Sequence, residues 1–248
     1  MADYEGIKFR YADMQRELER MQTLTQEFIS EDSRWVFGRC LENLENIRCA
    51  KQNRVHQFEI NKECPLKTIS SEGEYRASQK ERGISVFGTL SFRMGLENPH
   101  RGKNRQSDFH LVGEATTSIQ IFNSETDKLV ARWQIEAGDA TSPGCHFHSA
   151  ANQYSEDGIF PEWLKVPRLP SVLLTPMDGL EFLLGELFQT RWREHVSVES
   201  EVRNSWAKLQ GDRIKRILTW SLSQVSDPET TAWMDLKRAK PPLGLLTE

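Results

Sequence analysis

Two histidines separated by a single residue, His146 and His148, are the most chemically suggestive feature of the sequence. On an extended backbone alternate side chains point to the same face, so the two imidazoles would lie side by side while Phe147 points away. Paired imidazoles can bind a metal ion, transfer a proton or hold an anion. They can equally be structural groups that hydrogen-bond to backbone carbonyls, and a lone H-x-H motif does not separate these interpretations.

Charged residues in neighbouring segments would complete an enzyme site. Glu114 and Glu136 lie in segments of alternating polarity and would share the face of the histidines if the strands stay in register. Either carboxylate would act as a third metal ligand or as a base, and Arg168 would neutralise charge on a phosphoryl oxygen. This hypothesis is a metal-assisted hydrolase or nuclease acting on phosphodiesters or nucleotides, with a divalent metal at His146 and His148. Alternatively, Arg168 pairs with Glu136 and carries no function.

A basic loop at residues 98–107 is a second candidate, for contact with nucleic-acid phosphates. It contains Arg101, Lys103 and Arg105 but no aromatic side chain on which a base could stack. The formal net charge of −4 also argues against a broad nucleic-acid surface, so a solvated hairpin loop is the favoured interpretation. The sequence lacks G-x-x-x-x-G-K-[ST], G-x-G-x-x-G and G-x-S-x-G, which removes the common NTPase, dinucleotide-binding and serine-hydrolase classes.

The N-terminal segment has the spacing of an amphipathic helix. Apolar residues recur every three or four positions over residues 7–28. Five of them form a candidate partner-binding stripe: Ile7, Tyr11, Met14, Leu18 and Met21. A second helical pattern over residues 35–47 favours an intramolecular hairpin, with a coiled-coil dimer as the alternative.

The central segments alternate with a period of two, which is typical of strands. The pattern predicts strands at residues 55–60, 84–94, 109–122, 129–136 and 146–149, and a long polar loop at residues 62–83. Two helical patterns follow, at residues 175–192 and 199–225, and the first begins with the start signal Thr175, Pro176 and Asp178. Ile84 and Leu129 are among the residues expected in the core.

These patterns predict an α+β fold. We expect an N-terminal helical hairpin (residues 1–52) and a core domain (residues 53–226). In the core domain, a central antiparallel meander of four to five strands would carry two C-terminal helices on its apolar face. Residues 227–248 are expected to form a C-terminal tail.

Composition indicates a protein of the cytoplasm. The 248 residues contain four scattered cysteines without a C-x-x-C pair, which is typical of reduced thiols. No apolar run approaches the roughly 20 residues that span a bilayer, and the polar start does not fit a secretory signal. We therefore expect no membrane association.

Three short motifs carry a resemblance. The H-x-H of residues 146–148, the P-R-L-P of residues 167–170 and the T-P-x-D of residues 175–178 together resemble uncharacterised bacterial α+β proteins of mobile-element and antiphage-defence neighbourhoods. The resemblance implies a bacterial, intracellular, multi-component setting and no particular reaction.

The leading expectation is therefore an interaction or adaptor subunit of a bacterial multi-protein, antiviral-defence system. Its binding surface would be the N-terminal stripe or the charged residues 62–83, and its partner another protein or a second copy of the chain. The metal-assisted hydrolase is the alternative function.

Overall fold

The computed structural model describes residues 7–50, 54–76, 82–98, 108–138, 144–149, 169–225 and 230–247. Its strands are β1 (Lys8–Arg10), β2 (Val55–Ile60), β3 (Leu66–Lys67), β4 (Val86–Glu97), β5 (Asp108–Leu111), β6 (Ala115–Asn123), β7 (Leu129–Ala137), β8 (His146–Ser149) and β9 (Leu169–Pro170). Its helices are α1 (Tyr11–Leu24), α2 (Trp35–Cys49), α3 (Pro176–Ser197), α4 (Glu201–Gln224) and α5 (Ala232–Arg238), with a 3-10 turn, η1 (Glu31–Ser33).

The fold is α+β, as predicted, but the sheet is larger than predicted. Nine strands form one sheet with the order β1-β5-β4-β6-β7-β8-β9, and β2 and β3 also pair with β4. The expectation of four to five strands was wrong because β1, β3 and β9 are only two or three residues long. Strands this short show too few alternations to be recognised in a sequence.

The single strand expected over residues 109–122 is divided into two. Val112, Gly113 and Glu114 separate β5 from β6, and Gly113 has a positive φ of 77°. A residue in this conformation does not continue an extended strand. Strand β5 pairs with β1 and with the end of β4, whereas β6 lies between β4 and β7.

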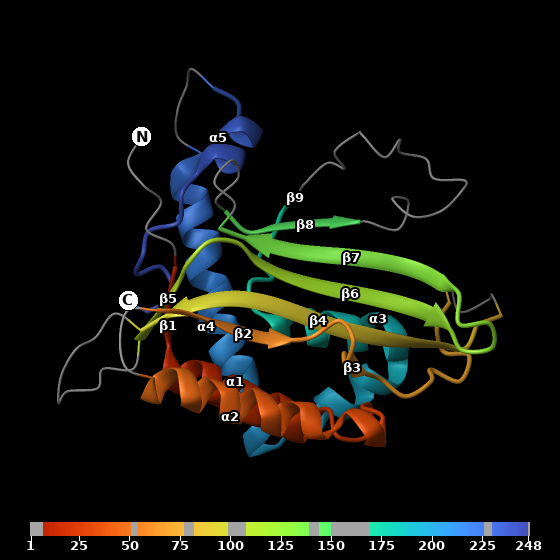
Figure 1. The fold of residues 1–248 in the computed structure, drawn as a ribbon. Coiled ribbons are helices and arrows are strands. Elements are labelled where there is room, and N and C mark those ends of the chain that lie inside the picture. The colour runs from red at the N-terminus through yellow and green to blue at the C-terminus, as the bar shows by residue number, and fades with distance from the viewer. Residues whose placement is uncertain are drawn as a thin grey trace.

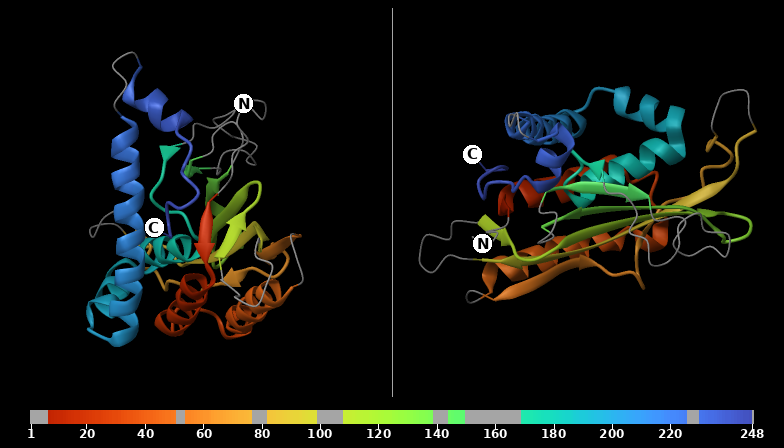
Figure 2. Two further views of the ribbon diagram at one scale, coloured as in Figure 1. Left: turned by 90° about the vertical axis from the view of Figure 1, so that its left-hand side faces the viewer. Right: turned by 90° about the horizontal axis from the view of Figure 1, so that it is seen from above.

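One face of the sheet is apolar and is covered by α3. Leu90, Ile119 and Ile135 are fully or almost fully buried on this face, at 0%, 0% and 2% exposure. At Gly88 of β4, an added Cβ would lie 2.6 Å from Leu183 Cδ1 of α3, so the helix and sheet approach closely here. Figure 2 shows α1, α3 and α4 on the same side of the sheet.

Two residues expected in this core are exposed, and a third, Trp133, is only partly buried. Ile84 precedes β4 and is 42% exposed, and Leu129 is 37% exposed. A register shift between Ile121 and Phe122 places Leu129 opposite Phe122. Because the side-chain period of a strand is two, such a shift changes which face a residue joins.

The N-terminal helices form the expected pair, and they share the core of the sheet. Met21 of α1 and Leu44 of α2 are fully buried in the same apolar cluster as the strand residues. Helix α2 packs beside β2, and α1 packs against α2, α3 and α4.

Only one of the two long C-terminal helices meets the expectation of packing on the apolar face. Helix α3 contacts β4 and β6, whereas α4 packs mainly against α1. Figure 1 shows α4 crossing behind the strands and continuing past the β8–β9 edge to α5. The cause lies in α4 itself, where only Trp206, Arg213 and Ile217 are buried, so its packing stripe is narrow and partly charged.

The segment after α4 is more structured than a tail. It contains α5, and its last residues pair with the N-terminal strand: the Lys8 amide donates to the Leu243 carbonyl at 2.9 Å. Arg10 donates to the Thr247 carbonyl, and Arg216 Nη1 donates to the Leu246 carbonyl at 2.7 Å. No helix in the described ranges has both the length and the apolar character needed to cross a membrane.

Candidate functional site

The polar face of the sheet brings together most of the residues singled out for chemistry. Strand β8 pairs antiparallel with β7, so His146 lies opposite Glu136 and His148 lies opposite Gln134. Strand β6 adds Thr116 opposite Glu136. The expected placement of both histidines beside a carboxylate is therefore observed.

Both histidines and Glu136 are buried, and His148 contacts polar side chains of β7. His146, His148 and Glu136 are 5%, 7% and 7% exposed. His148 Nε2 lies 2.9 Å from Gln134 Oε1 and 3.8 Å from Glu136 Oε1. An imidazole held between an amide and a carboxylate can exchange a proton, and it can equally fix the pairing of two strands.

Glu114 directly precedes β6, next to the polar face. It is exposed in the turn between β5 and β6, and it lines a recess of about 620 Å³ on the polar face together with Glu136 and Arg93. Arg168 lies outside the described residues. Within the described ranges, no group of three His, Cys, Asp or Glu side chains is arranged to hold a metal ion.

The recess has an acidic lining. Four carboxylates border it, from Glu59, Glu63, Glu114 and Glu136, against the cations of Lys62 and Arg93. A site for phosphodiesters usually presents the opposite charge balance. The basic residues Arg101, Lys103 and Arg105 lie outside the described residues.

The candidate partner-binding stripe is part of the core. Ile7, Met14, Leu18 and Met21 are between 0% and 6% exposed, and Tyr11 is partly buried against the same cluster. These side chains are consumed by packing within the chain and are not available to a partner. The correction has a simple cause: an amphipathic stripe has the same spacing whether it faces its own sheet or another molecule.

A buried polar network, missed in the sequence, joins three helices. Arg213 Nη2 of α4 lies 3.1 Å from Glu17 Oε1 of α1 and 2.6 Å from Asp178 Oδ1 of α3. Thr175 donates its hydroxyl to Glu17. Asp178 Oδ2 also accepts the backbone amides of Leu174 and Thr175 at 3.1 and 3.0 Å.

The network includes the predicted start of α3. Thr175 and Asp178 form a reciprocal capping box, which satisfies amides that the first helical turn leaves without partners. The T-P-x-D motif therefore identified the helix start correctly. Its contacts with the other two helices left no signal in the sequence. Thr175 is 158 residues from Glu17, and Asp178 is 35 residues from Arg213.

The electrostatics of this network centre on two carboxylates and one guanidinium. Burial raises the pKa of the Glu17 carboxyl above its ordinary value of 4.5; Arg213 opposes this shift, and the negative charge of Asp178 adds to it. Burial alone would lower the pKa of Arg213, but the two carboxylates outweigh it and raise that pKa. Arg213 is therefore a permanent cation that holds α1, α3 and α4 together.

No protein-family model, no curated protein and no solved structure matches this chain. A function is therefore proposed from the geometry of the structure and the sequence motifs.

Proposed function

We propose that this protein is an interaction subunit of a bacterial multi-protein system, and that a partner protein docks on the projecting end of α4 together with α5. The observation that carries the proposal is a stripe of exposed apolar side chains on α4. Leu218 is 52% exposed, Leu222 76% and Val225 39%. The bacterial setting rests on the resemblance of the H-x-H, P-R-L-P and T-P-x-D motifs.

The stripe lies on a face of α4 that its own fold does not use. Residues spaced by four share one face of a helix, as Leu218 and Leu222 do, and Val225 follows directly after the last residue of α4. The residues that anchor α4 on the body, Trp206 and Ile217, are 2% and 3% exposed and lie on another face. The C-terminal end of α4 also extends past the edge of the sheet (Figures 1 and 2).

Helix α5 contributes two further large side chains. Trp233 is 44% exposed and Met234 36%, on a helix that packs against α4. We call these five residues the α4–α5 patch: Leu218, Leu222, Val225, Trp233 and Met234. Aromatic residues and methionine are enriched in protein interfaces, and concentrated exposed apolar surface is typical of an interaction site.

The charges near the patch indicate the chemistry of the partner. Lys215 on α4 and Lys237 and Arg238 in the last turn of α5 are exposed. An apolar helix or loop flanked by carboxylates would bury the patch and pair with this basic rim, which gives orientation and faster association.

A double substitution on α4 tests the proposal. Leu218→Glu with Leu222→Glu places two charges in the patch without touching a buried residue, so the protein should keep its fold. Tagged wild-type and variant protein are used for pull-down from the native lysate with quantitative mass spectrometry, and recovered candidates are purified and titrated against both forms. We expect a partner whose affinity falls at least about 100-fold in the variant, because two buried leucines contribute about 1.5–3 kcal/mol each.

Ser223→Glu is the matched control, since Ser223 is exposed on the same helix and lies one residue from Leu222 and five from Leu218, spacings that do not share a helix face. The control should bind like the wild type. Light scattering of the purified chain shows whether the occupant is a second copy. A monomer whose recovered proteins are identical for wild type and double variant would overturn the proposal.

The metal-assisted hydrolase at His146 and His148 remains a competing hypothesis with weaker support, because the described residues lack a three-ligand group and the adjoining recess is acidic. Metal analysis of the purified protein, with His146→Ala and His148→Ala compared on DNA, RNA and nucleotides, tests it. Activity that survives the double substitution would count against it.

A further inference from the structure

The recess on the polar face of the sheet contains a compact grid of polar side chains from three adjacent strands. In Figure 1, α3 and α4 lie behind the sheet, so this face is turned toward the viewer. Strands β4, β6 and β7 supply two residues each, and the strand pairing places them in two neighbouring rows. The first row is Ser91, Ser118 and Gln134, the second is Arg93, Thr116 and Glu136, and all six line the recess.

The pairing register brings these six side chains close together. Paired strands lie about 4.8 Å apart, and alternate residues of one strand are separated by about 7 Å and point to the same face. The grid therefore covers about 10 by 7 Å of the sheet. This area matches the footprint of one small ring with its substituents.

The two serines of the grid are buried without being used by the fold. Ser91 is 8% exposed and Ser118 is 5% exposed, and both line the recess. Neither hydroxyl has a side-chain hydrogen-bond partner among the described residues, yet neither oxygen is fully inaccessible. The two adjacent hydroxyls are therefore positioned for a partner from outside the chain, in surroundings that hold little water.

The walls of the recess are fixed by hydrogen bonds. His148 Nε2 lies 2.9 Å from Gln134 Oε1, and the amide nitrogen of Gln134 makes no hydrogen bond within the described part of the chain. When His148 donates through Nε2, that nitrogen is the group of Gln134 left to donate. On the other side, Arg93 Nε donates to Gln57 Oε1 at 3.0 Å. Oriented donors thus flank the two serine hydroxyls.

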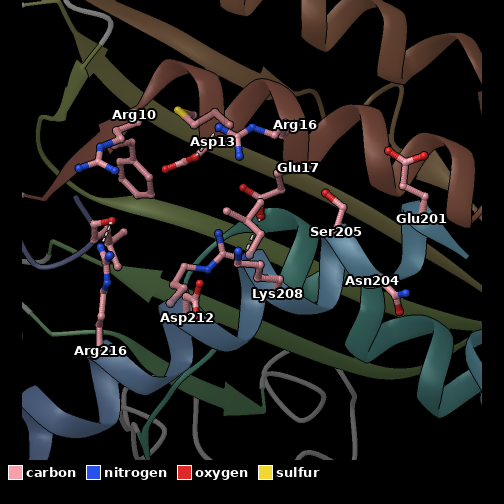
Figure 3. Close-up of a pocket in the computed structure, with 15 residues that line it drawn as sticks. Arg10, Asp13, Arg16, Glu17, Glu201, Asn204, Ser205, Lys208, Asp212 and Arg216 are labelled. Atoms are coloured by element: carbon pink, nitrogen blue, oxygen red, sulfur yellow. Dashed lines mark hydrogen bonds and ion pairs between the residues drawn. The ribbon is translucent and has the colours of Figure 1, made fainter. Parts of the chain in front are cut away.

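The larger cleft between α1 and α4 is built differently. Figure 3 shows its two walls, and its buried carboxylate, Glu17, is held by Arg213 at 3.1 Å. Ser205 in the same cleft accepts a hydrogen bond from Arg20 Nε at 3.3 Å. These polar groups hold the helices together, whereas the serines of the sheet recess have no such task.

We propose that the recess on the polar face binds a carbohydrate, with one sugar ring lying on the grid. A sugar hydroxyl both donates and accepts hydrogen bonds, and the grid combines hydroxyls with amide and guanidinium donors and a carboxylate acceptor. Four carboxylates against two cations around the recess disfavour an anionic ligand. The polar lining also gives little contact area to an apolar ligand.

Probes that share one ring shape test the proposal. The methyl pyranosides of glucose, mannose and galactose are titrated into the full-length protein, and amide chemical shifts are followed by NMR. Tetrahydropyran, glucuronate and glucosamine serve as the ring without hydroxyls, the anion and the cation. We expect saturable binding of at least one neutral glycoside, with shifts in β4, β6 and β7, weaker binding of glucuronate and no binding of tetrahydropyran. Binding of glucosamine alone would mean that charge selects the ligand, which would overturn the proposal.

The variant Ser91→Ala with Ser118→Ala removes both hydroxyls and no bond on which the fold depends. It should keep its melting temperature and bind the glycoside about tenfold more weakly. Ser85→Ala is the matched control, since Ser85 precedes β4 and lies outside the recess. The proposal is also overturned if no neutral glycoside binds, or if the control weakens binding as much as the double variant. Protein with Leu218→Glu and Leu222→Glu should bind the glycoside like wild type, so this test is independent of partner docking.

Discussion

Arg213 is the residue on which the packing of three helices depends. It is shared by two buried carboxylates, so the group carries a net negative charge when both are ionised. Removing a charge from water without a full partner is unfavourable, and uptake of a proton by Glu17 relieves that imbalance. The raised pKa of Glu17 thus couples the junction of α1, α3 and α4 to pH.

Glu17→Gln tests this coupling. The pKa of Glu17 in the folded protein lies above its ordinary value of 4.5, so the folded state binds more protons than the unfolded state just above that pH. Its ionisation therefore lowers stability as pH rises from about 4.5 through the folded-state pKa. Glutamine keeps an oxygen for Thr175 and Arg213 without the charge, so the melting temperature of the variant should rise relative to wild type across this range.

Glu45→Gln is a control of opposite sign. The hydrogen bond from Arg48, followed by those from Tyr11 and Cys49, lowers the pKa of the half-exposed Glu45 to about 2. Its contribution is present above pH 4.5 and is lost as pH falls toward 2. The melting temperatures of Glu17→Gln and wild type are compared from about pH 4 to about pH 8, a range that includes the ordinary pKa of a carboxyl group and values above it. If the difference between the two melting temperatures stays constant over this range, the coupling is contradicted.

At the scale of elements, the division of β5 from β6 and the end of β7 depend on one another. Gly113 and Gly138 both have positive φ, of 77° and 83°. An added Cβ at Gly138 would lie 2.3 Å from the Gly113 carbonyl oxygen, whereas one at Gly113 would meet nothing within 4 Å. The close approach of the two backbones therefore limits position 138 to glycine.

Alanine substitutions separate these two effects. Gly113→Ala should cost about 1–2 kcal/mol, the strain of a left-handed residue alone. Gly138→Ala adds a backbone clash that no rotamer relieves, so its cost should exceed that of Gly113→Ala by about 1–3 kcal/mol. Urea unfolding measures both, and Gly211→Ala is the control, because this open helical position in α4 should gain about 0.5–1 kcal/mol. Equal costs at Gly113 and Gly138 would show that the close approach is absent.

At the scale of the whole molecule, a single apolar cluster extends from α1 and α2 through the sheet to α3 and α4. The reactivity of the four cysteines can measure how tightly this cluster is packed, because all four are free thiols and they differ in burial. Cys49 and Cys64 are exposed, and Cys40 is buried. Burial raises the pKa of Cys40 to about 12 and also raises that of Cys145, whose Sγ lies 2.6 Å from the Leu173 carbonyl oxygen.

Thiol labelling of the native protein should therefore have two phases. Cys49 and Cys64 should react rapidly, and Cys40 and Cys145 slowly, because a thiol must be both accessible and deprotonated to react. Mass spectrometry after digestion identifies the labelled positions, and labelling in guanidinium should reach all four at one rate. Rapid labelling of Cys40 in the native protein would mean that α2 does not pack as described.

The local pattern of the chain determined its elements and the main pairing of its strands. The period-two alternation placed His146 and His148 on one face with Glu136, since strand geometry fixes which side chains share a face. The T-P-x-D motif gave the start of α3 through the same local logic. Such features depend on residues a few positions apart.

Only the tertiary structure decided which apolar helix faces are buried in the core and which stay exposed to solvent. The stripe of Met14 and Leu18 became core, while the similarly spaced Leu218 and Leu222 stayed exposed. Helical spacing is identical in the two cases, and the difference arises from which helix face meets the sheet. The network of Glu17 and Arg213 was also settled at this level, because its members are 196 residues apart and meet only when α1 and α4 pack together.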